Sequence, residues 1–276
     1  MASRRLALLV SMFALAIAAL VPATASAWAP ASSATIHPGV QTFTQGAQCT
    51  ANFIYQNGSD VYIGQAAHCS GTGAATETDG CLAQSLPLGT PVEIDGASRP
   101  GVLAYSSWLT MQGNGESDEE TCAYNDFALV RIDPADVANV NPSVPGYGGP
   151  TGVGEPGSTG ADVYSYGNSS LRFGISQLSP KQGTLVTSTP EGWSHSVYTV
   201  TPGIPGDSGS GFLSSTGAAF GTLSTVAIAP LPLSNGVSDL SNELAYARAN
   251  SSFTGVSLVP GTEPFTPDIV GAILGG

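Results

Sequence analysis

Short runs of β-branched and aromatic residues, separated by turn-forming residues, recur along most of the chain after residue 48. Residues 52–55 and 61–63 flank Asn57-Gly58, a dipeptide that favours a tight hairpin turn. Similar runs are typical of strands at 91–94, 102–105, 108–111, 127–132, 162–166, 183–187, 194–200 and 218–223. The pattern predicts an all-β fold.

One helix is expected near the end, from about Asp239 to Ala249, because Leu240, Leu244 and Ala247 recur at helical spacing. Residues 141–160 are rich in Gly and Pro and predict an irregular connection between two β-rich halves. The expected divisions are a first half at 49–140, a second half with the helix at 161–259, and a tail at 260–276.

The first 27 residues have the pattern of a secretory signal peptide. Arg4 and Arg5 precede an apolar run at 6–21, and Ala25-Ser26-Ala27 provides small residues for cleavage. A membrane anchor is the alternative, but the run is short for a spanning helix. We therefore expect a secreted, extracellular protein, with residues 28–48 forming an N-terminal arm or a short pro-segment.

The chain is strongly acidic, with 20 Asp and Glu against 7 Lys and Arg, for a formal charge of −13. Removal of Arg4 and Arg5 with the signal peptide would leave five basic residues and a charge of −15. Such a surface repels nucleic acid and anionic lipid. We expect neither a nucleic-acid partner nor a membrane partner after cleavage, and a monomer is expected.

Four cysteines, Cys49, Cys69, Cys81 and Cys122, predict two disulfides in an exported chain, and three pairings are possible. Their spacing fits no zinc site, so neither a metal nor another cofactor is predicted. The acidic stretch 116–120 is compatible with calcium, but a solvated turn is favoured because the ligand order of an EF-hand is absent.

Three stretches carry residues with catalytic potential. Ser208 lies within the glycine-rich stretch Pro205–Gly211, where the backbone can turn tightly and direct N–H groups toward the serine oxygen. A serine hydroxyl needs a base to become a useful nucleophile. His68 follows a predicted strand, and Asp126 directly precedes the apolar run 127–132. The other histidines, His37 and His195, are interpreted as ordinary polar residues.

Together these stretches resemble the chymotrypsin-like (trypsin-fold) serine proteases of the bacterial secreted type. The matching residues are AAHC at 66–69, NDFALV at 125–130 and GDSG at 206–209, in the His, Asp, Ser order described for that family. The regions that bear these motifs cover most of residues 49–226. The resemblance implies two six-stranded antiparallel β-barrels with the active site between them.

The resemblance also implies the role of each residue. His68 and Asp126 would lie on the first barrel and Ser208 on the second. Ser208 would attack a peptide carbonyl, His68 would accept its proton, and Asp126 would orient the imidazole. The backbone N–H groups of Gly206 and Ser208 would form an oxyanion hole. The expected activity is that of a serine endopeptidase acting on peptides or proteins.

The resemblance further implies a disulfide between Cys49 and Cys69 beside the histidine, and with it one between Cys81 and Cys122. The family's usual bridges in the second barrel have no cysteines here. A second departure is Ser210-Gly211, where the family commonly has Gly-Pro.

Asp207 needs a cation because a buried carboxylate without one is costly. Animal members of the family use a new N-terminal amine made by cleavage, whereas bacterial relatives use an internal arginine. Arg172 lies in the comparable loop, so we expect an Asp207–Arg172 ion pair and no activating cut.

The residues that would line the specificity pocket are uncharged: Thr201, Pro202, Gly203, Ile204, Ser224, Thr225 and Val226. Val226 stands where relatives often keep glycine and would shorten the pocket, so cleavage after small or medium apolar residues is predicted. Ser224 also matches the serine that hydrogen-bonds the aspartate in the family. Two alternatives stay open: a catalytically idle relative that binds peptides, and an esterase on the same fold.

Overall fold

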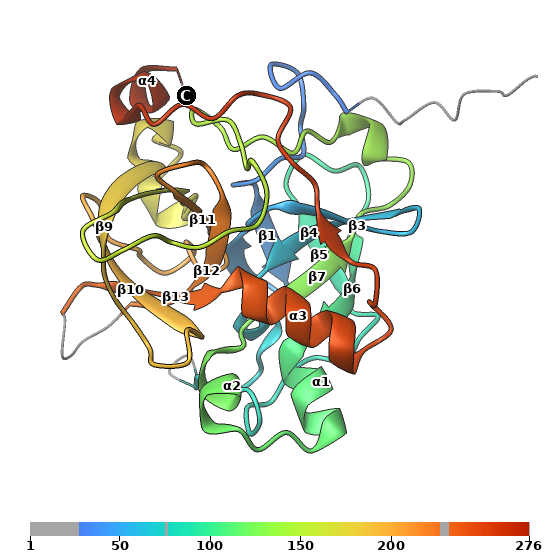
Figure 1. Cartoon of the computed structure of the whole chain (residues 1–276). Helices are drawn as coiled ribbons and strands as arrows, with labels where there is room; N and C mark the ends of the chain where they lie inside the picture. Colours follow the sequence, from blue (N-terminus) through green and yellow to red (C-terminus); the bar gives the residue numbers. More distant parts are fainter. Residues whose placement is uncertain (1–27, 75–76, 227–231, 276) are drawn as a thin grey trace, which may run out of the picture.

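The computed structural model describes residues 28–74, 77–226 and 232–275, and the predicted signal peptide at 1–27 lies outside them. Within these residues the first half forms an eight-stranded antiparallel sheet, and the second half forms a closed six-stranded barrel (Figure 1). Few helices accompany the strands. The predicted all-β fold with two halves is confirmed.

The first sheet has the strand order β14-β3-β4-β7-β6-β5-β1-β2. Its strands are β1 (Gln41–Thr44), β2 (Ala47–Thr50), β3 (Ile54–Asn57), β4 (Asp60–Gln65), β5 (Pro91–Ile94), β6 (Gly101–Ser106), β7 (Ala128–Arg131) and β14 (Ser257–Leu258). The predicted hairpin joins β3 to β4, with Asn57 opposite Asp60 and Gly58 at a φ of 63°.

This sheet has eight strands where the resemblance implied six. One additional strand comes from near the C-terminus, where β14 pairs with β3 and places Leu258 opposite Tyr55. At the other edge, β1 and the start of β2 lie before residue 49, within the segment expected to be an arm or pro-segment. The residues of the first sheet therefore extend beyond 49–140 at both ends.

The second barrel closes in the order β10-β13-β12-β11-β8-β9. Its strands are β8 (Asp162–Tyr166), β9 (Pro180–Ser188), β10 (Ser194–Thr199), β11 (Gly211–Ser214), β12 (Ala219–Val226) and β13 (Asn235–Asp239). Seven buried apolar residues fill its interior: Val163, Leu185, Val197, Phe212, Phe220, Leu223 and Val237. Excluding these side chains from water is a main source of the barrel's stability.

Four α-helices occur in the described residues: α1 (Ser107–Asn114), α2 (Glu119–Tyr124), α3 (Leu240–Asn250) and α4 (Ile269–Leu274). The helix predicted near the end is α3, which begins at Leu240 with the Asp239 side chain capping the amide of Asn242. In Figure 1, α3 crosses in front of the first sheet.

The strand predicted at 108–111 is wrong, because these residues lie in α1. Ser106 caps this helix by accepting from the amide of Leu109, and Gly115 ends it in the left-handed conformation. The apolar run faces inward, with Trp108 and Met111 buried. Periodicity over four residues does not distinguish a strand from one helical turn, and the caps decide here.

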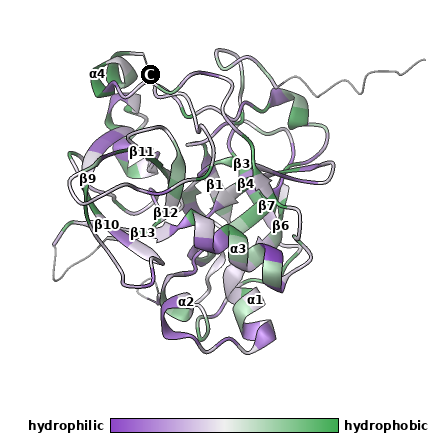
Figure 2. Cartoon of the chain, in the orientation of Figure 1, coloured by the Kyte–Doolittle hydropathy of each residue, from purple (hydrophilic) through white to green (hydrophobic). Residues whose placement is uncertain are grey.

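A second core lies where the two halves meet. It joins Phe53, Tyr55 and Phe127 of the first half to Tyr164 and Leu213 of the second. In Figure 2 the hydrophobic colour follows β7 into the interior, whereas α3 is green on some turns and purple on others. This shared core holds the halves in one arrangement, which a site built from both requires.

The C-terminal tail is docked on the second half. The Phe265 ring lies 5.5 Å from the Tyr164 ring, and the amide of Thr266 donates to the carbonyl of Tyr147. Asp268 caps α4 through the amides of Val270 and Gly271.

The acidic stretch 116–120 begins α2. Asp118 accepts from the amide and the hydroxyl of Thr121, and Glu116 accepts from the hydroxyl of Tyr246 and from two amides. These bonds favour the interpretation as a capped turn. Separately, the described helices include none that is both long and apolar enough to traverse a lipid bilayer.

Candidate active site

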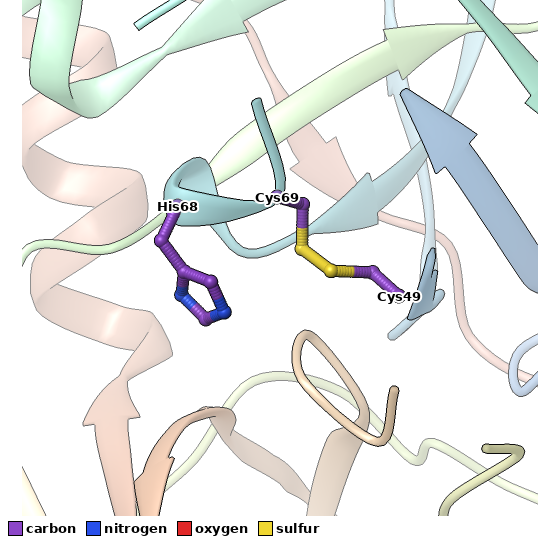
Figure 3. Close-up of side chains that lie close together, drawn as sticks. All are labelled: Cys49, His68 and Cys69. Carbon is purple, nitrogen blue, oxygen red and sulfur yellow. A yellow bond between two sulfur atoms is a disulfide. The ribbon is translucent and has the colours of Figure 1, made fainter. Parts of the chain in front are cut away.

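His68 lies on the 3-10 helix η1 (Ala67–Ser70), which follows directly after β4. The next residue, Cys69, forms a disulfide with Cys49 on β2. Figure 3 shows the imidazole and the disulfide projecting from this same short helix. About a quarter of the His68 side chain, 26%, is exposed, so the ring is accessible from solvent while its backbone is fixed by the crosslink.

Asp126 lies between α2 and β7 and directs both carboxylate oxygens at the histidine. Its Oδ2 accepts from Nδ1 of His68 at 2.6 Å, and its Oδ1 accepts from the His68 amide at 2.9 Å. Oγ of Ser224, on β12, donates to Oδ2 at 2.5 Å. The carboxylate thereby fixes the tautomer of the ring, with Nδ1 protonated and Nε2 free to accept a proton.

His68 and Asp126 each stabilise the charged form of the other. Burial disfavours the charged forms of both groups, but their attraction and hydrogen bonds outweigh it. The pKa of the His68 ring is raised above its usual 6.5. The pKa of the Asp126 carboxyl is lowered, with Ser224 contributing through its hydrogen bond. Asp126 is therefore ionised at neutral pH and stabilises a protonated ring.

Ser208 lies in the turn between β10 and β11, and it lines the same cleft as His68 and Asp126. This cleft has a volume of about 1040 Å³ and takes its walls from both halves of the chain. Among the described residues no hydrogen bond joins Nε2 of His68 to Oγ of Ser208. Such bonds are often long without substrate and tighten in the complex.

The backbone N–H groups of Gly206 and of Ser208 itself have no partner among the described residues. Among the hydrogen bonds of the described residues, none is donated by the amide of Gly206 or of Ser208, whereas the amides of Asp207 and Gly209 bond to Ile204 and Leu223. Gly206 has a φ of 97°, a conformation that glycine adopts at little cost. These two donors are those for which the family resemblance implied a role in an oxyanion hole.

Asp207 is fully buried and binds two cations. Arg172 is on the 3-10 helix η3 (Ser170–Arg172) and contacts both carboxylate oxygens, at 2.7 and 3.3 Å. Lys181 Nζ lies 3.2 Å from Oδ2. The amides of Ser169 and Ile204 complete the set at 3.1 and 3.2 Å. Arg172 was predicted from the sequence as a partner of Asp207, whereas Lys181 was not.

The residues expected to form a specificity pocket divide into three groups. Gly203, Ile204, Ser224 and Thr225 line the cleft. Thr201 and Pro202 turn their carbonyl oxygens to Nζ of Lys181, at 3.0 and 3.2 Å. The side chain of Val226 lies outside the described part of the structure, so the expected shortening of the pocket stays a prediction.

The other two histidines lie away from the cleft lining. Nδ1 of His37 donates to the carbonyl of Pro38 at 2.8 Å. His195 is buried on β10 between Ser188 and Asp239, at 2.8 and 3.0 Å. Both have local partners, as their interpretation as ordinary polar residues requires.

Cysteine sulfurs approach other potential metal ligands at two places in the described structure. Cys49 and Cys69 lie near His68, and Cys81 and Cys122 lie near Asp79, with ligand atoms within 4.8 Å in each group. Both cysteine pairs are disulfides. A disulfide offers no thiolate, which is the form of cysteine that binds metal.

No family model matches the chain, and no curated protein matches it either. Among solved structures, protease A of Thermobifida fusca superposes with a TM-score of 0.52 at 21% identity, over 82% of this chain and 99% of that one.

Two further serine proteases superpose over 81% of this chain and the whole of theirs, each with a TM-score of 0.50. They are the thermostable protease AL20 of an extremophilic microorganism, at 17% identity, and a glutamic-acid-specific protease, at 16%. At these identities the likeness concerns the fold. This chain has the fold of the bacterial chymotrypsin-like serine proteases.

Proposed function

We propose that the chain is a secreted serine endopeptidase that cleaves peptide bonds through an acyl-enzyme on Ser208. The observation that carries the proposal is the pairing of His68 Nδ1 with Asp126 at 2.6 Å in the cleft that Ser208 also lines. This pairing leaves Nε2 as the only ring atom able to take the proton from a nucleophile in the cleft. The fold is consistent with this activity without establishing it.

In the proposed mechanism the Ser208 oxygen bonds to the carbonyl carbon of the substrate while His68 Nε2 accepts the serine proton. Negative charge moves to the carbonyl oxygen, which the amides of Gly206 and Ser208 stabilise. His68 then donates the proton to the leaving amine, and the acyl group remains on Ser208. In the second half of the cycle water attacks the ester carbon while His68 accepts a proton from it. The bond between the acyl carbon and the Ser208 oxygen then breaks, and His68 returns the proton to that oxygen as the acid product leaves.

Asp126 stabilises the imidazolium formed in both steps. Nδ1 carries a proton in both the neutral and the charged ring, so neither form requires the carboxylate to give up any of its three hydrogen bonds. Since the pKa of Asp126 is lowered, the carboxylate does not take the proton itself.

The proposed substrates carry a small or medium apolar residue before the scissile bond. Gly203, Ile204 and Thr225 line the cleft near the serine and carry no charge, which favours apolar side chains. One structural neighbour is described as glutamate-specific and as using a histidine triad to bind substrate. In the described lining of this cleft His68 is the sole histidine, so a glutamate preference receives no support.

Export is supported by the two disulfides, since such bonds persist in oxidising compartments. The proposed signal peptide at 1–27 would be removed before Trp28. N-terminal sequencing of the exported protein would test this directly, and retention of residue 1 would contradict it.

A fluorophosphonate probe tests the catalytic assignment. The intact protein should become covalently labelled, Ser208→Ala should not, and a peptide from the labelled protein should carry the adduct on Ser208. Ser210→Ala, two residues away in the same glycine-rich stretch, is the matched control and should still label. Absence of labelling in the intact protein would favour a peptide-binding protein without activity. Labelling combined with hydrolysis of short-chain esters but not of casein would favour an esterase.

A further inference from the structure

The turn that carries Ser208 is held by its carbonyl oxygens. Pro205 O accepts from Oγ of Ser169 at 2.5 Å, Gly206 O accepts from Oγ1 of Thr50 at 2.7 Å, and Ser208 O accepts from the amide of Thr50 at 2.8 Å. Asp207 O accepts from the amide of Ser210 within the turn. Four successive carbonyls therefore have donors, whereas the amides of Gly206 and Ser208 have no acceptor in the part of the chain that the structure describes.

The bond from Ser169 has a direct effect on the amide of Gly206. In a trans peptide the C=O and N–H point in opposite directions across a rigid plane. Holding Pro205 O toward Ser169 consequently turns the Gly206 N–H away from Ser169. A rotation of this plane would place a carbonyl oxygen where the negative charge of the intermediate must be stabilised.

Thr50 fixes the next plane from the other half of the molecule. Its hydroxyl donates to Gly206 O and accepts from the amide of Asn168 at 3.0 Å. Gln48 assists by donating to Gly206 O at 2.9 Å. The segment that carries Ser169 and the strand that carries Thr50 therefore hold the two peptide planes on either side of Gly206.

Neither Ser169 nor Thr50 can touch a substrate. Ser169 is 1% exposed and Thr50 is fully buried, and neither lines the cleft. Ser169 is itself fixed, because its amide donates to Asp207 and its hydroxyl accepts from the amide of Leu171. We infer that Ser169 and Thr50 are positioning residues for the oxyanion hole, which hold the Gly206 N–H toward the cleft. This inference rests on the proposed serine hydrolase activity.

Ser169→Ala tests the inference with the loss of a single oxygen atom. Two rates should each fall about 10- to 100-fold: the rate at which a fluorophosphonate labels Ser208, and kcat for a p-nitrophenyl ester. This fall is no larger than the fall in kcat expected when one oxyanion donor is removed outright. KM should change little, since the lost interaction acts in the transition state. Ser169→Thr retains a hydroxyl and should restore most of the rate.

A matched control separates positioning from general stability. Ser165 is also buried and donates to a backbone carbonyl, that of Gly211, at 2.8 Å. Ser165→Ala should lower the unfolding temperature without the fall in kcat. Thr50→Val removes the second hydroxyl at nearly constant volume, and it carries the test if Ser169→Ala does not fold.

The possible failures are distinguishable. An intact protein that does not label at all overturns the proposed activity and this inference with it. If the intact protein is labelled, and the Ser169→Ala and Thr50→Val variants are labelled at the same rate as it is, the inference is overturned but the proposed activity is not. An equal fall of kcat in Ser165→Ala would also overturn it.

Discussion

The ammonium group of Lys181 lies 3.2 Å from Oδ2 of Asp207, the residue directly before Ser208. Lys181 is the only lysine of the chain, and its side chain is completely buried. The pKa of this lysine is lowered overall. Burial and the neighbouring Arg172 both lower it, and together they outweigh Asp207, which raises it. One carboxylate thus pairs with two cations next to the turn that carries Ser208, and the same lysine donates to the carbonyls of Thr201 and Pro202.

Replacing Asp207 by asparagine should be strongly destabilising, because it leaves the cations of Arg172 and Lys181 without a buried counter-charge. Breaking a buried ion pair from one side costs about 3–5 kcal/mol. Urea unfolding of Asp207→Asn would measure this loss. Asp60→Asn is the control, since the Asp60–Arg131 pair is 3.9 Å long and exposed, and it should change the unfolding free energy little. Equal effects of the two substitutions would contradict the prediction.

Activity should fall on acidification with a midpoint above 6.5, the ordinary pKa of histidine. The free base is the neutral form of His68, and its pKa is raised above 6.5 by Asp126 despite burial. As the pH falls through that raised pKa, the ring becomes protonated and cannot accept the serine proton. The rate of fluorophosphonate labelling as a function of pH measures the midpoint. A midpoint below 6.5 would show that burial outweighs the carboxylate.

Asp126→Asn should lower that labelling rate by about 10⁴-fold, the scale seen when a triad aspartate is replaced. The asparagine amide would donate to Nδ1 and stabilise the wrong tautomer, with the proton on Nε2. Asp136→Asn provides a control, because Asp136 is buried and accepts from the amides of Ser98 and Arg99 away from the cleft. That variant should label at nearly the normal rate.

The two disulfides should contribute similarly to stability but differently to activity. Cys49 and Cys69 are separated by 20 residues and Cys81 and Cys122 by 41, and closing loops of these lengths contributes about 3–4 kcal/mol each in the chain-entropy model. Replacing either pair with serine should lower the unfolding free energy. Only the first replacement should also slow labelling of Ser208, because Cys69 is adjacent to His68. Equal slowing by both would contradict a local role.

The sequence predicted most of what local patterns determine. The hairpin at Asn57-Gly58 and the helix that follows Asp239 have their own turn or cap residues, so three or four positions suffice to recognise them. The motifs around His68, Asp126 and Ser208 were likewise visible as short stretches. What brings those three residues into one cleft is packing between the two halves, and only the resemblance to a known family indicated it.

The features that the sequence missed depend on long-range contacts. Lys181 follows a proline at the start of a strand, and nothing nearby marks it as a partner of Asp207, 26 positions later. Its being the sole lysine of an acidic chain was the one available signal. The pairing of β14 with β3 joins residues about 200 positions apart, and a two-residue strand has too little periodicity to be recognised.

Glu243, on α3, is a buried carboxylic acid that should make the stability of the fold depend on pH. Its side chain is fully buried, its Oε2 accepts from Oγ1 of Thr222 at 3.4 Å, and its Oε1 has no partner among the described residues. Burial, with the nearby charges of Asp126 and Asp239, raises the pKa of Glu243 well above 4.5. Above about pH 4.5 the folded protein therefore keeps a proton that the unfolded chain has already released.

It follows that stability falls as the pH rises above about 4.5, until the raised pKa of the folded state is reached. Glu243→Gln mimics the protonated acid and removes this dependence. The variant should match the native protein in acid and exceed it in stability at neutral pH, as measured by urea unfolding at the two pH values. Glu155→Gln, at an exposed position, is the control and should behave alike at both. A native protein that gains stability over Glu243→Gln as the pH rises would show that Glu243 is ionised and paired in the folded state.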